Sequence, residues 1–209
     1  MEVQFYGANC VVINGKQGRL VIDDNLSELG AKAVAKEGDL ALFTVASHPE
    51  PTQTPKLLID QPGEYEVSGV SVYGIAARAH MDEEIQVSAT MYKLILDDMS
   101  ILITGHVYPE LSDDQLETIG MVDIMFVPVG GNGYTLDSVG ALKLIKKIEP
   151  KLVIPTHYDD PSLNFPVPQQ PLDQALKVLA MEPRETVAKL KLKGTLLGDV
   201  TQLMVLEKS

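Results

Sequence analysis

Residues 124–131 read Ile-Met-Phe-Val-Pro-Val-Gly-Gly, and residues 152–158 read Leu-Val-Ile-Pro-Thr-His-Tyr. Each stretch opens with a short uninterrupted apolar run, which is typical of a strand buried on both faces. Between them, the apolar residues of 141–148 follow helical spacing, and Pro150 lies just beyond the end of that pattern. A strand, a helix and a second strand in succession predict parallel strands in an α/β fold.

The rest of the chain contains more strand patterns than helix patterns. The pair Asn14-Gly15 lies between two apolar runs and indicates a hairpin. Ser112 and Gln115 match a capping box that opens a helix through Ile119, and a further helix is predicted after Pro171. Further strands are predicted over Val3–Tyr6, Cys10–Ile13, Leu20–Asp23, Leu40–Val45, Leu57–Ile59, Glu64–Val67, Val70–Ile75, Ala89–Leu96, Ser100–Thr104, Val187–Leu192 and Gln202–Leu206. We therefore predict one domain, residues 1–209, folded as a four-layer αββα sandwich.

The composition predicts a soluble protein of the cytoplasm. The chain has 209 residues, of which 45% are hydrophobic and 22% are charged. We expect no membrane association, because no stretch approaches the roughly 18 apolar residues that span a bilayer. The N-terminus lacks the basic start of a secretory signal. The single cysteine, Cys10, excludes an internal disulfide and is expected in the core.

The net charge of −12, from 17 basic and 29 acidic residues, limits the partners. A field of this sign repels phosphate backbones, so we expect no nucleic-acid binding. The lysines near residues 146 and 191 are expected on solvated faces. The expected partner is a small-molecule ligand or a second copy of the chain.

Four histidines, His48, His80, His106 and His157, each follow an apolar strand-like run. Side chains at the ends of strands in α/β sheets converge on ligands, so these four imidazoles could meet in one cleft. Imidazole is a common ligand of zinc and also suits iron. The alternative is that each histidine is a hydrogen-bonded structural residue.

Acidic residues and two loops add further candidates. Glu50 lies two residues after His48, a spacing that places both side chains on one face of an extended segment, and Asp23 closes a strand. The Gly130–Gly133 loop either binds an anion or is a tight strand-to-helix connection. The proline-rich segment 161–171 is either a plain surface loop or a lid near a site.

Several stretches resemble the metallo-β-lactamase superfamily, in particular small bacterial members of its L-ascorbate-6-phosphate lactonase-like branch. The matching segments are Phe5–Cys10 ("YGHSC" in the family), Leu20–Asp23 ("LIDP"), Ile59–Val67 ("PGEYEV"), Val127–Gly131 ("PVGG") and Ile154–Tyr158 ("PTHY"). The resemblance implies the αββα fold and hydrolysis of an ester, lactone, amide or phosphodiester. In that chemistry one or two zinc or manganese ions activate a water molecule.

The family motif His-x-His-x-Asp-His is degenerate in this chain. In one register His48 keeps the first histidine, while Glu50, Thr52 and Gln53 replace the other members. A register shifted by a few residues loses His48 as well. Ala8 replaces the opening histidine of the family, and His106 replaces the aspartate that bridges two metals.

Two hypotheses follow from these departures. The first is a binding or scaffold protein that lacks dinuclear hydrolase activity and holds no metal. The second is a mononuclear hydrolase of a small lactone, ester or phosphoester, with one zinc, iron or manganese ion. In the second, the ligands come from His48, Glu50, His80, His106 and His157, and Glu50 or Asp23 serves as the base.

Overall fold

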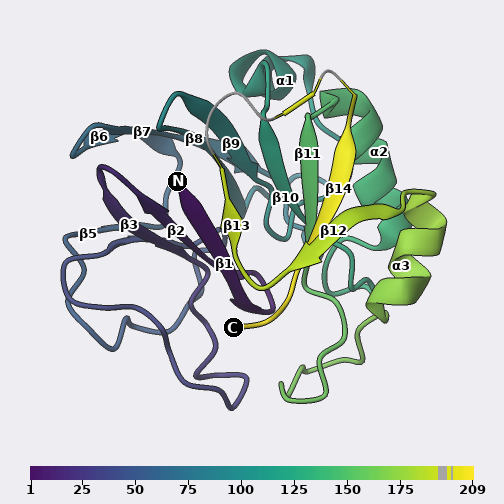
Figure 1. Ribbon diagram of the computed structural model, residues 1–209, viewed down its shortest axis with the longest axis horizontal. Coiled ribbons are helices and arrows are strands. Elements are labelled where there is room, and N and C mark those ends of the chain that lie inside the picture. The colour runs from purple at the N-terminus through teal and green to yellow at the C-terminus, as the bar shows by residue number, and fades with distance from the viewer. Residues whose placement is uncertain (193–196, 199) are drawn as a thin grey trace.

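Figure 1 shows a computed structural model of the chain, which describes residues 1–192, 197–198 and 200–209. Two β-sheets pack face to face, and helices cover the outer side of the larger sheet (Figure 1). The two-sheet α/β fold predicted from the sequence is therefore confirmed. Among the helices of the described residues, none combines the length and the apolar character needed to cross a bilayer.

The smaller sheet contains strands from the first third of the chain and one from near its end. Its strands are β1 (Glu2–Gly7), β2 (Cys10–Gly15), β3 (Gly18–Ile22), β4 (Leu40–Leu42), β5 (Leu57–Ile59) and β13 (Leu190–Lys191). Their spatial order is β13-β1-β2-β3-β4-β5. β2 and β3 pair antiparallel, which confirms the hairpin predicted at Asn14-Gly15, and β4 and β5 extend the sheet in parallel.

The larger sheet is antiparallel on one side and parallel on the other. Its strands are β6 (Gly63–Val67), β7 (Val70–Ala77), β8 (Ala89–Leu96), β9 (Met99–Ile103), β10 (Ile124–Pro128), β11 (Leu152–Thr156), β12 (Pro183–Val187) and β14 (Gln202–Leu206). Their spatial order is β12-β14-β11-β10-β9-β8-β7-β6. β9, β10 and β11 run parallel to one another, so their carboxyl ends lie at one edge of the sheet.

The helices are α1 (Asp113–Ile119), α2 (Ser138–Ile148) and α3 (Leu172–Leu179). The capping box predicted at Ser112 and Gln115 is present and satisfies two backbone N–H groups at the start of α1. α2 connects β10 to β11, as the strand–helix–strand pattern predicts. Apolar residues of all three helices pack on the outer face of the larger sheet.

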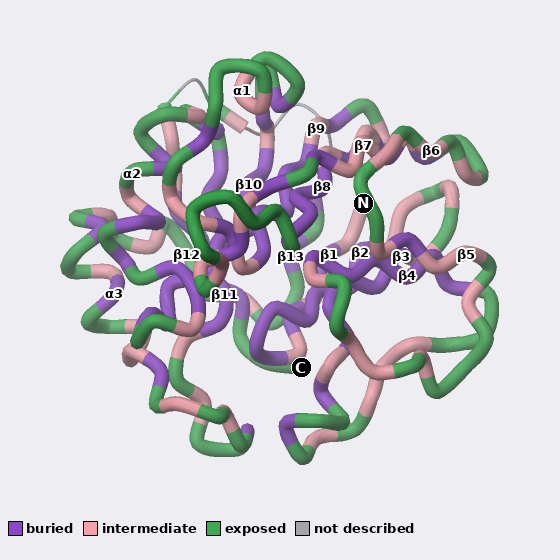
Figure 2. The backbone as a smooth tube through the Cα atoms, turned by 180° about the vertical axis from the view of Figure 1, so that it is seen from behind, coloured by how far each residue is buried: buried purple, intermediate pink, exposed green. Residues whose placement is uncertain are grey.

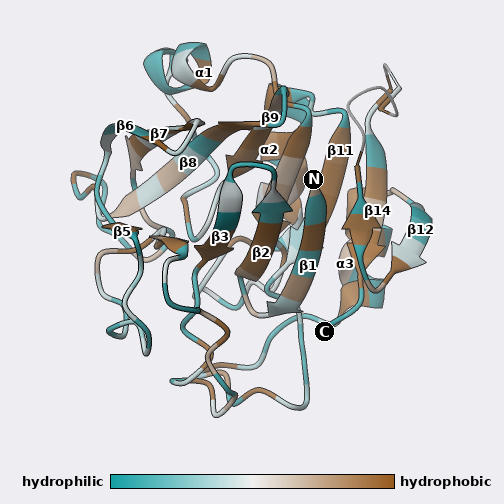
Figure 3. Cartoon of the chain, turned by 60° about the vertical axis from the view of Figure 1, so that its left-hand side comes forward, coloured by the Kyte–Doolittle hydropathy of each residue, from teal (hydrophilic) through white to brown (hydrophobic). Residues whose placement is uncertain are grey.

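The main core lies between the two sheets and contains apolar side chains from both. Figure 2 shows the buried residues concentrated along the strands, and Figure 3 shows hydrophobic residues following β1, β2 and β3. Tyr92 on β8 is fully buried in this core, and its hydroxyl donates to the carbonyls of Phe43 (3.0 Å) and Ile59 (3.2 Å). This side chain therefore ties the larger sheet to the strands of the smaller one.

The outer face of the smaller sheet is covered differently from the predicted helical layer. Within the described residues, the segment 24–38 covers this face without forming a helix, and Leu26 and Leu29 pack against Cys10. Gly30 adopts a φ of 80°, and the carboxylate of Asp24 accepts the backbone N–H groups of Val34 (2.8 Å) and Ala35 (2.7 Å). These side-chain bonds replace the backbone bonds that a helix would make. The burial of Cys10 agrees with the sequence prediction.

Two strand predictions differ in extent. The strand predicted over Leu40–Val45 ends at Leu42, and Val45 instead forms an isolated bridge with Ala89 of the larger sheet. The strand predicted over Val187–Leu192 is divided between β12 in the larger sheet and β13 in the smaller sheet. The chain crosses from one sheet to the other there, and an apolar pattern alone does not record such a crossing.

Candidate functional site

Two histidines meet at the edge where the parallel strands of the larger sheet end. His106 lies three residues beyond β9, and His157 follows β11 directly. Their rings lie edge to face, with centroids 4.8 Å apart and an interplanar angle of 81°. The structure thus brings together two of the four histidines that the sequence predicted to converge.

Aromatic side chains surround this pair. The ring of Tyr134 lies 5.3 Å from that of His106 and 5.7 Å from that of His157. Phe165 lies 5.1 Å from His157 on another side. We call His106, Tyr134, His157, Phe165 and Gln169 the histidine cluster.

Gln169 fixes the tautomer of His157. Its amide nitrogen donates to the carbonyl of Val167 (2.9 Å), which orients the amide and points its oxygen at Nδ1 of His157 (3.1 Å). Because an amide oxygen only accepts, Nδ1 carries the proton. Nε2 of His157 is then unprotonated and can accept a hydrogen bond.

Burial keeps both imidazoles uncharged. Burial and, to a smaller extent, the nearby His157 together lower the pKa of His106 to about 3. Burial also lowers the pKa of His157 to about 4, against a smaller opposing effect of the bond to Gln169. At neutral pH the cluster therefore presents neutral nitrogen donors and acceptors and no local positive charge.

The backbone of His80 is bonded to that of His106, a member of the histidine cluster. Its N–H donates to the carbonyl of His106 (2.7 Å), and its ring lies 6.2 Å from that of Tyr108. Burial lowers the pKa of His80, and its Nδ1 is buried without a hydrogen-bond partner among the described residues. The loop between β7 and β8 thus adds a third imidazole near His106.

His48 is held in a separate environment. Its ring stacks on Phe43, with centroids 3.9 Å apart and an interplanar angle of 7°. Its Nε2 lies 3.3 Å from Oδ2 of Asp60, and its Nδ1 lies 3.0 Å from the carbonyl of Pro49. Both ring nitrogens are therefore engaged by oxygen atoms, in contacts distinct from those of the histidine cluster.

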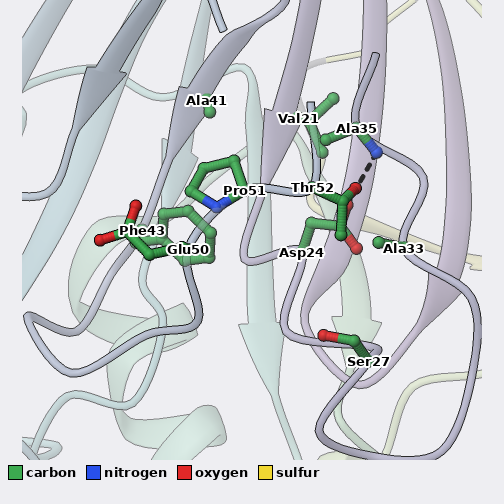
Figure 4. A pocket seen from close by; sticks show the side chains of 10 residues that line it. All are labelled: Val21, Asp24, Ser27, Ala33, Ala35, Ala41, Phe43, Glu50, Pro51 and Thr52. Atoms are coloured by element: carbon green, nitrogen blue, oxygen red, sulfur yellow. Dashed lines mark hydrogen bonds between the residues drawn. The ribbon is translucent and has the colours of Figure 1, made fainter. Parts of the chain in front are cut away.

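The surroundings of the two carboxylates proposed as bases differ from each other. Glu50 is exposed and lies beside Phe43 at the lining of a cavity of about 10 Å³, which also includes Asp24 (Figure 4). A cavity of this size holds about one water molecule. Asp23 is buried, and both of its oxygens accept hydrogen bonds from Thr44.

Three non-glycine residues around this region have a left-handed backbone. Ala8, Asp23 and His157 have φ values of 49°, 47° and 52°, in the left-handed region that non-glycine residues rarely adopt. The N–H of His157 donates to the carbonyl of Ala8 (2.7 Å). Such conformations cost about 1–3 kcal/mol each and often cluster at binding sites.

Sequence reasoning did not single out Tyr134, Phe165 or Gln169. Tyr134 follows the Gly130–Gly133 loop, and the other two lie in the segment 161–171. The sequence indicated both loops as candidates, but it did not indicate these three residues. A Cβ on Gly130 would lie 2.1 Å from the Gln169 amide oxygen and from the His157 carbonyl. The loop is therefore tightly packed against the cluster at this point.

Across residues 1–192, 197–198 and 200–209, the structure contains no group of three or more His, Cys, Asp or Glu side chains placed to hold a metal ion. The donors of the histidine cluster are two imidazoles, a phenol and an amide. The engaged nitrogens of His48 and the separate position of Glu50 do not supply a second set. These residues do not fit a dinuclear metal centre.

Comparison with known proteins gives one family and several relatives. Residues 2–157 match the family model described as the beta-lactamase superfamily domain. The chain is 48% identical over 44 residues to a UPF0173 metal-dependent hydrolase of Carboxydothermus hydrogenoformans, and 37% identical over 82 residues to one of Salinibacter ruber. These matches cover 21% and 39% of the chain, and only 19% and 34% of the lengths of those relatives.

The fold has a structural relative in Thermotoga maritima. That protein is described as a zinc-dependent hydrolase of the metallo-β-lactamase superfamily, and it superimposes with a TM-score of 0.75. The match covers 99% of this chain and 98% of the other, at 22% sequence identity. At this identity the likeness establishes the shared fold alone.

Proposed function

The chain belongs to the beta-lactamase superfamily, and from that premise we propose that it is a cytoplasmic, single-domain binding protein with an eroded metal centre. In this proposal it lacks dinuclear hydrolase activity and binds a small molecule at the histidine cluster, or a second copy of itself. We place it near the L-ascorbate-6-phosphate lactonase-like branch, with a degenerate His-x-His-x-Asp-His motif.

The environment of His48 is the observation that carries this proposal. His48 is the residue that retains a motif histidine in one register, yet its ring lies flat on Phe43 and both of its nitrogens face oxygen atoms. A metal ligand needs a free lone pair directed at the ion. Without His48, and with Glu50 at a separate small cavity, the cluster lacks the carboxylates on which two-metal hydrolysis depends.

What remains at the cluster is suited to recognition. The unprotonated Nε2 of His157 can accept a hydrogen bond from a ligand, and the rings of Tyr134 and Phe165 provide flat apolar contacts. The neutral imidazoles favour a ligand with an N–H or O–H donor over an anion. The strained backbone at His157 supports a selected geometry at this position.

The test is metal content together with hydrolysis, measured on protein purified without a polyhistidine tag. Elemental mass spectrometry follows dialysis against zinc and then against manganese. Lactone, p-nitrophenyl acetate and bis-p-nitrophenyl phosphate are the substrates. We expect no stoichiometric metal and no turnover above that of a His106→Ala/His157→Ala variant. One metal per chain, lost in that variant and retained in the control His48→Ala, would overturn the proposal.

A mononuclear hydrolase is the second candidate, and two imidazoles in contact, with the backbone of a third histidine bonded beside them, favour it. The ring centroids of His106 and His157 lie 4.8 Å apart, and the backbone N–H of His80 donates to the carbonyl of His106. A mononuclear site would require the His80 ring to turn toward this pair as the third donor for one zinc, iron or manganese ion. In that case His80→Ala would remove both the metal and the hydrolysis of a small lactone, ester or phosphoester.

A further inference from the structure

We propose that a groove on the smaller sheet is a binding site for a small organic anion that carries a phosphate or carboxylate group. The groove is lined by residues 32–36 together with Tyr6, Arg19, Thr52 and Gln53, and has a volume of about 420 Å³. We call it the Lys32–Lys36 groove. Its lining includes no residue of the histidine cluster, so the inference stands independently of the proposed function.

The exposed charge that lines the groove is opposite in sign to the net charge of the molecule. Three of its lining residues, Arg19, Lys32 and Lys36, are cationic and none is acidic, whereas the whole chain carries −12. In an otherwise repulsive field, a local cluster of positive charge is the place where an anion is stabilised. A groove of this volume also lies within the usual range for small-molecule sites.

The wall of the groove is held in place by two buried carboxylates. Asp24 accepts the backbone N–H groups of Val34 and Ala35. Asp39 accepts the backbone N–H of Lys36 (2.6 Å) and also the guanidinium of Arg19. Because both carboxylates are buried, these bonds are shielded from water and fix a segment that has no helix or strand of its own.

Lys32 and Lys36 supply the positive charge that is available to bind an anion. The guanidinium of Arg19 is bonded to Asp39 and to the carbonyl of Val34 (3.0 Å). It therefore holds the wall of the groove in place, and its charge is already paired. Lys32 and Lys36 flank the fixed segment and are exposed, and their side-chain ammonium groups have no hydrogen-bond or ion-pair partner within the described residues. Two ammonium groups on either side of a rigid segment match the charge of a phosphate monoester or a dicarboxylate.

The uncharged lining suits the organic part of such a ligand. Tyr6 offers a ring and a hydroxyl, and Thr52 and Gln53 offer further hydrogen-bond donors. The small side chains of Ala33 and Ala35 leave the space between these groups open, and Figure 4 shows both near Thr52. A polyanion is disfavoured because its remaining charges would be repelled by the net charge of −12 that the chain carries.

The test is a nuclear magnetic resonance titration of the full chain with phenyl phosphate, at constant ionic strength. Inorganic phosphate and benzoate, in parallel titrations, distinguish phosphate from carboxylate recognition. We expect saturable shifts of the amides of residues 32–36, Thr52 and Gln53. We also expect binding at least about tenfold weaker in Lys32→Gln/Lys36→Gln. Lys143→Gln/Lys146→Gln, which removes the same charge from the exposed face of α2, is the matched control.

Three results would overturn the proposal. The first is amide shifts that rise linearly with ligand concentration and occur near many surface lysines. Another is equal weakening in the α2 control, because the effect would then come from net charge alone. The third is tighter binding of a single-stranded oligonucleotide than of phenyl phosphate through the same two lysines, which would assign the groove to nucleic acid.

Discussion

The buried carboxylate of Asp23 accepts two hydrogen bonds from Thr44, one from its backbone N–H and one from its hydroxyl, each 2.7 Å long. Asp23 follows β3, and Thr44 follows the parallel strand β4, so the pair joins the ends of two adjacent strands. Thr44 also accepts, through its carbonyl, the N–H of Thr90 at the start of β8 (2.8 Å). These bonds connect the smaller sheet to the larger one beside the histidine cluster.

Asp23 gives the stability a pH dependence of defined sign. Burial raises its pKa from an ordinary 3.8 to about 6, against the smaller opposing effect of the Thr44 bonds. The folded state therefore binds more protons than the unfolded state between these values, and stability falls as the pH rises through them. Relative to Asp23→Asn, the wild-type free energy of unfolding should decrease by about 2 kcal/mol from pH 4 to pH 7. Urea denaturation measures this difference, and parallel pH profiles would contradict it.

Gly105 is required by its contact with the same threonine. It has a φ of 60°, and a Cβ at this position would lie 2.3 Å from Oγ1 and 2.4 Å from Cβ of Thr44. Gly105→Ala should lower the free energy of unfolding by about 3 kcal/mol or more, through the clash and the strained backbone together. Gly133→Ala is the control, since Gly133 has a φ of 74° but no atom within 4 Å of the added carbon. It should cost only about 1 kcal/mol. Equal losses in chemical denaturation would show that the contact with Thr44 is unimportant.

Much of the fold follows from local sequence. Uninterrupted apolar runs mark β10 and β11 because both faces of a central parallel strand are buried, and Ser112 and Gln115 mark the start of α1 through reciprocal backbone bonds. The segment 24–38, which covers the smaller sheet, was predicted less well. There the side chain of Asp24 accepts backbone N–H groups ten or more residues along the chain, in place of the hydrogen bonds of a helix.

The site was predictable where topology alone determines it. His106 and His157 meet because they follow parallel strands that end at one edge, a relationship that sequence order implies. The environment of His48 depends on the ring of Phe43 and the carboxylate of Asp60, which a strand-end argument does not consider. Phe165 and Gln169 belong to a long irregular segment, and only the folded structure shows which of its residues reach the cluster.

Tyr92 should contribute to stability through its hydroxyl as well as its ring. Burial raises its pKa well above the usual value for tyrosine, so the hydroxyl stays protonated and donates to the Phe43 and Ile59 carbonyls. Tyr92→Phe removes the donor and leaves buried acceptors in the inter-sheet core, which should cost about 2 kcal/mol. Tyr73→Phe, at a partly exposed position on β7, should change the free energy of unfolding by less than about 0.5 kcal/mol. A Tyr92→Phe loss no larger than that of Tyr73→Phe would contradict the link between the sheets.

His157 should make the protein sensitive to acid in the direction opposite to Asp23. Its pKa is lowered by burial from 6.5 to about 4, so the unfolded state binds more protons between these values and stability falls as the pH decreases through them. The loss from this one imidazole between pH 7 and pH 5 should be about 2 kcal/mol. His157→Asn removes the titration and keeps a residue that tolerates the positive φ of 52°. Urea denaturation of both proteins in the presence of a chelator should give a shallower acid dependence for the variant. The same slope in both would mean that another group causes the acid sensitivity, and that the His157 ring is solvated in the folded state.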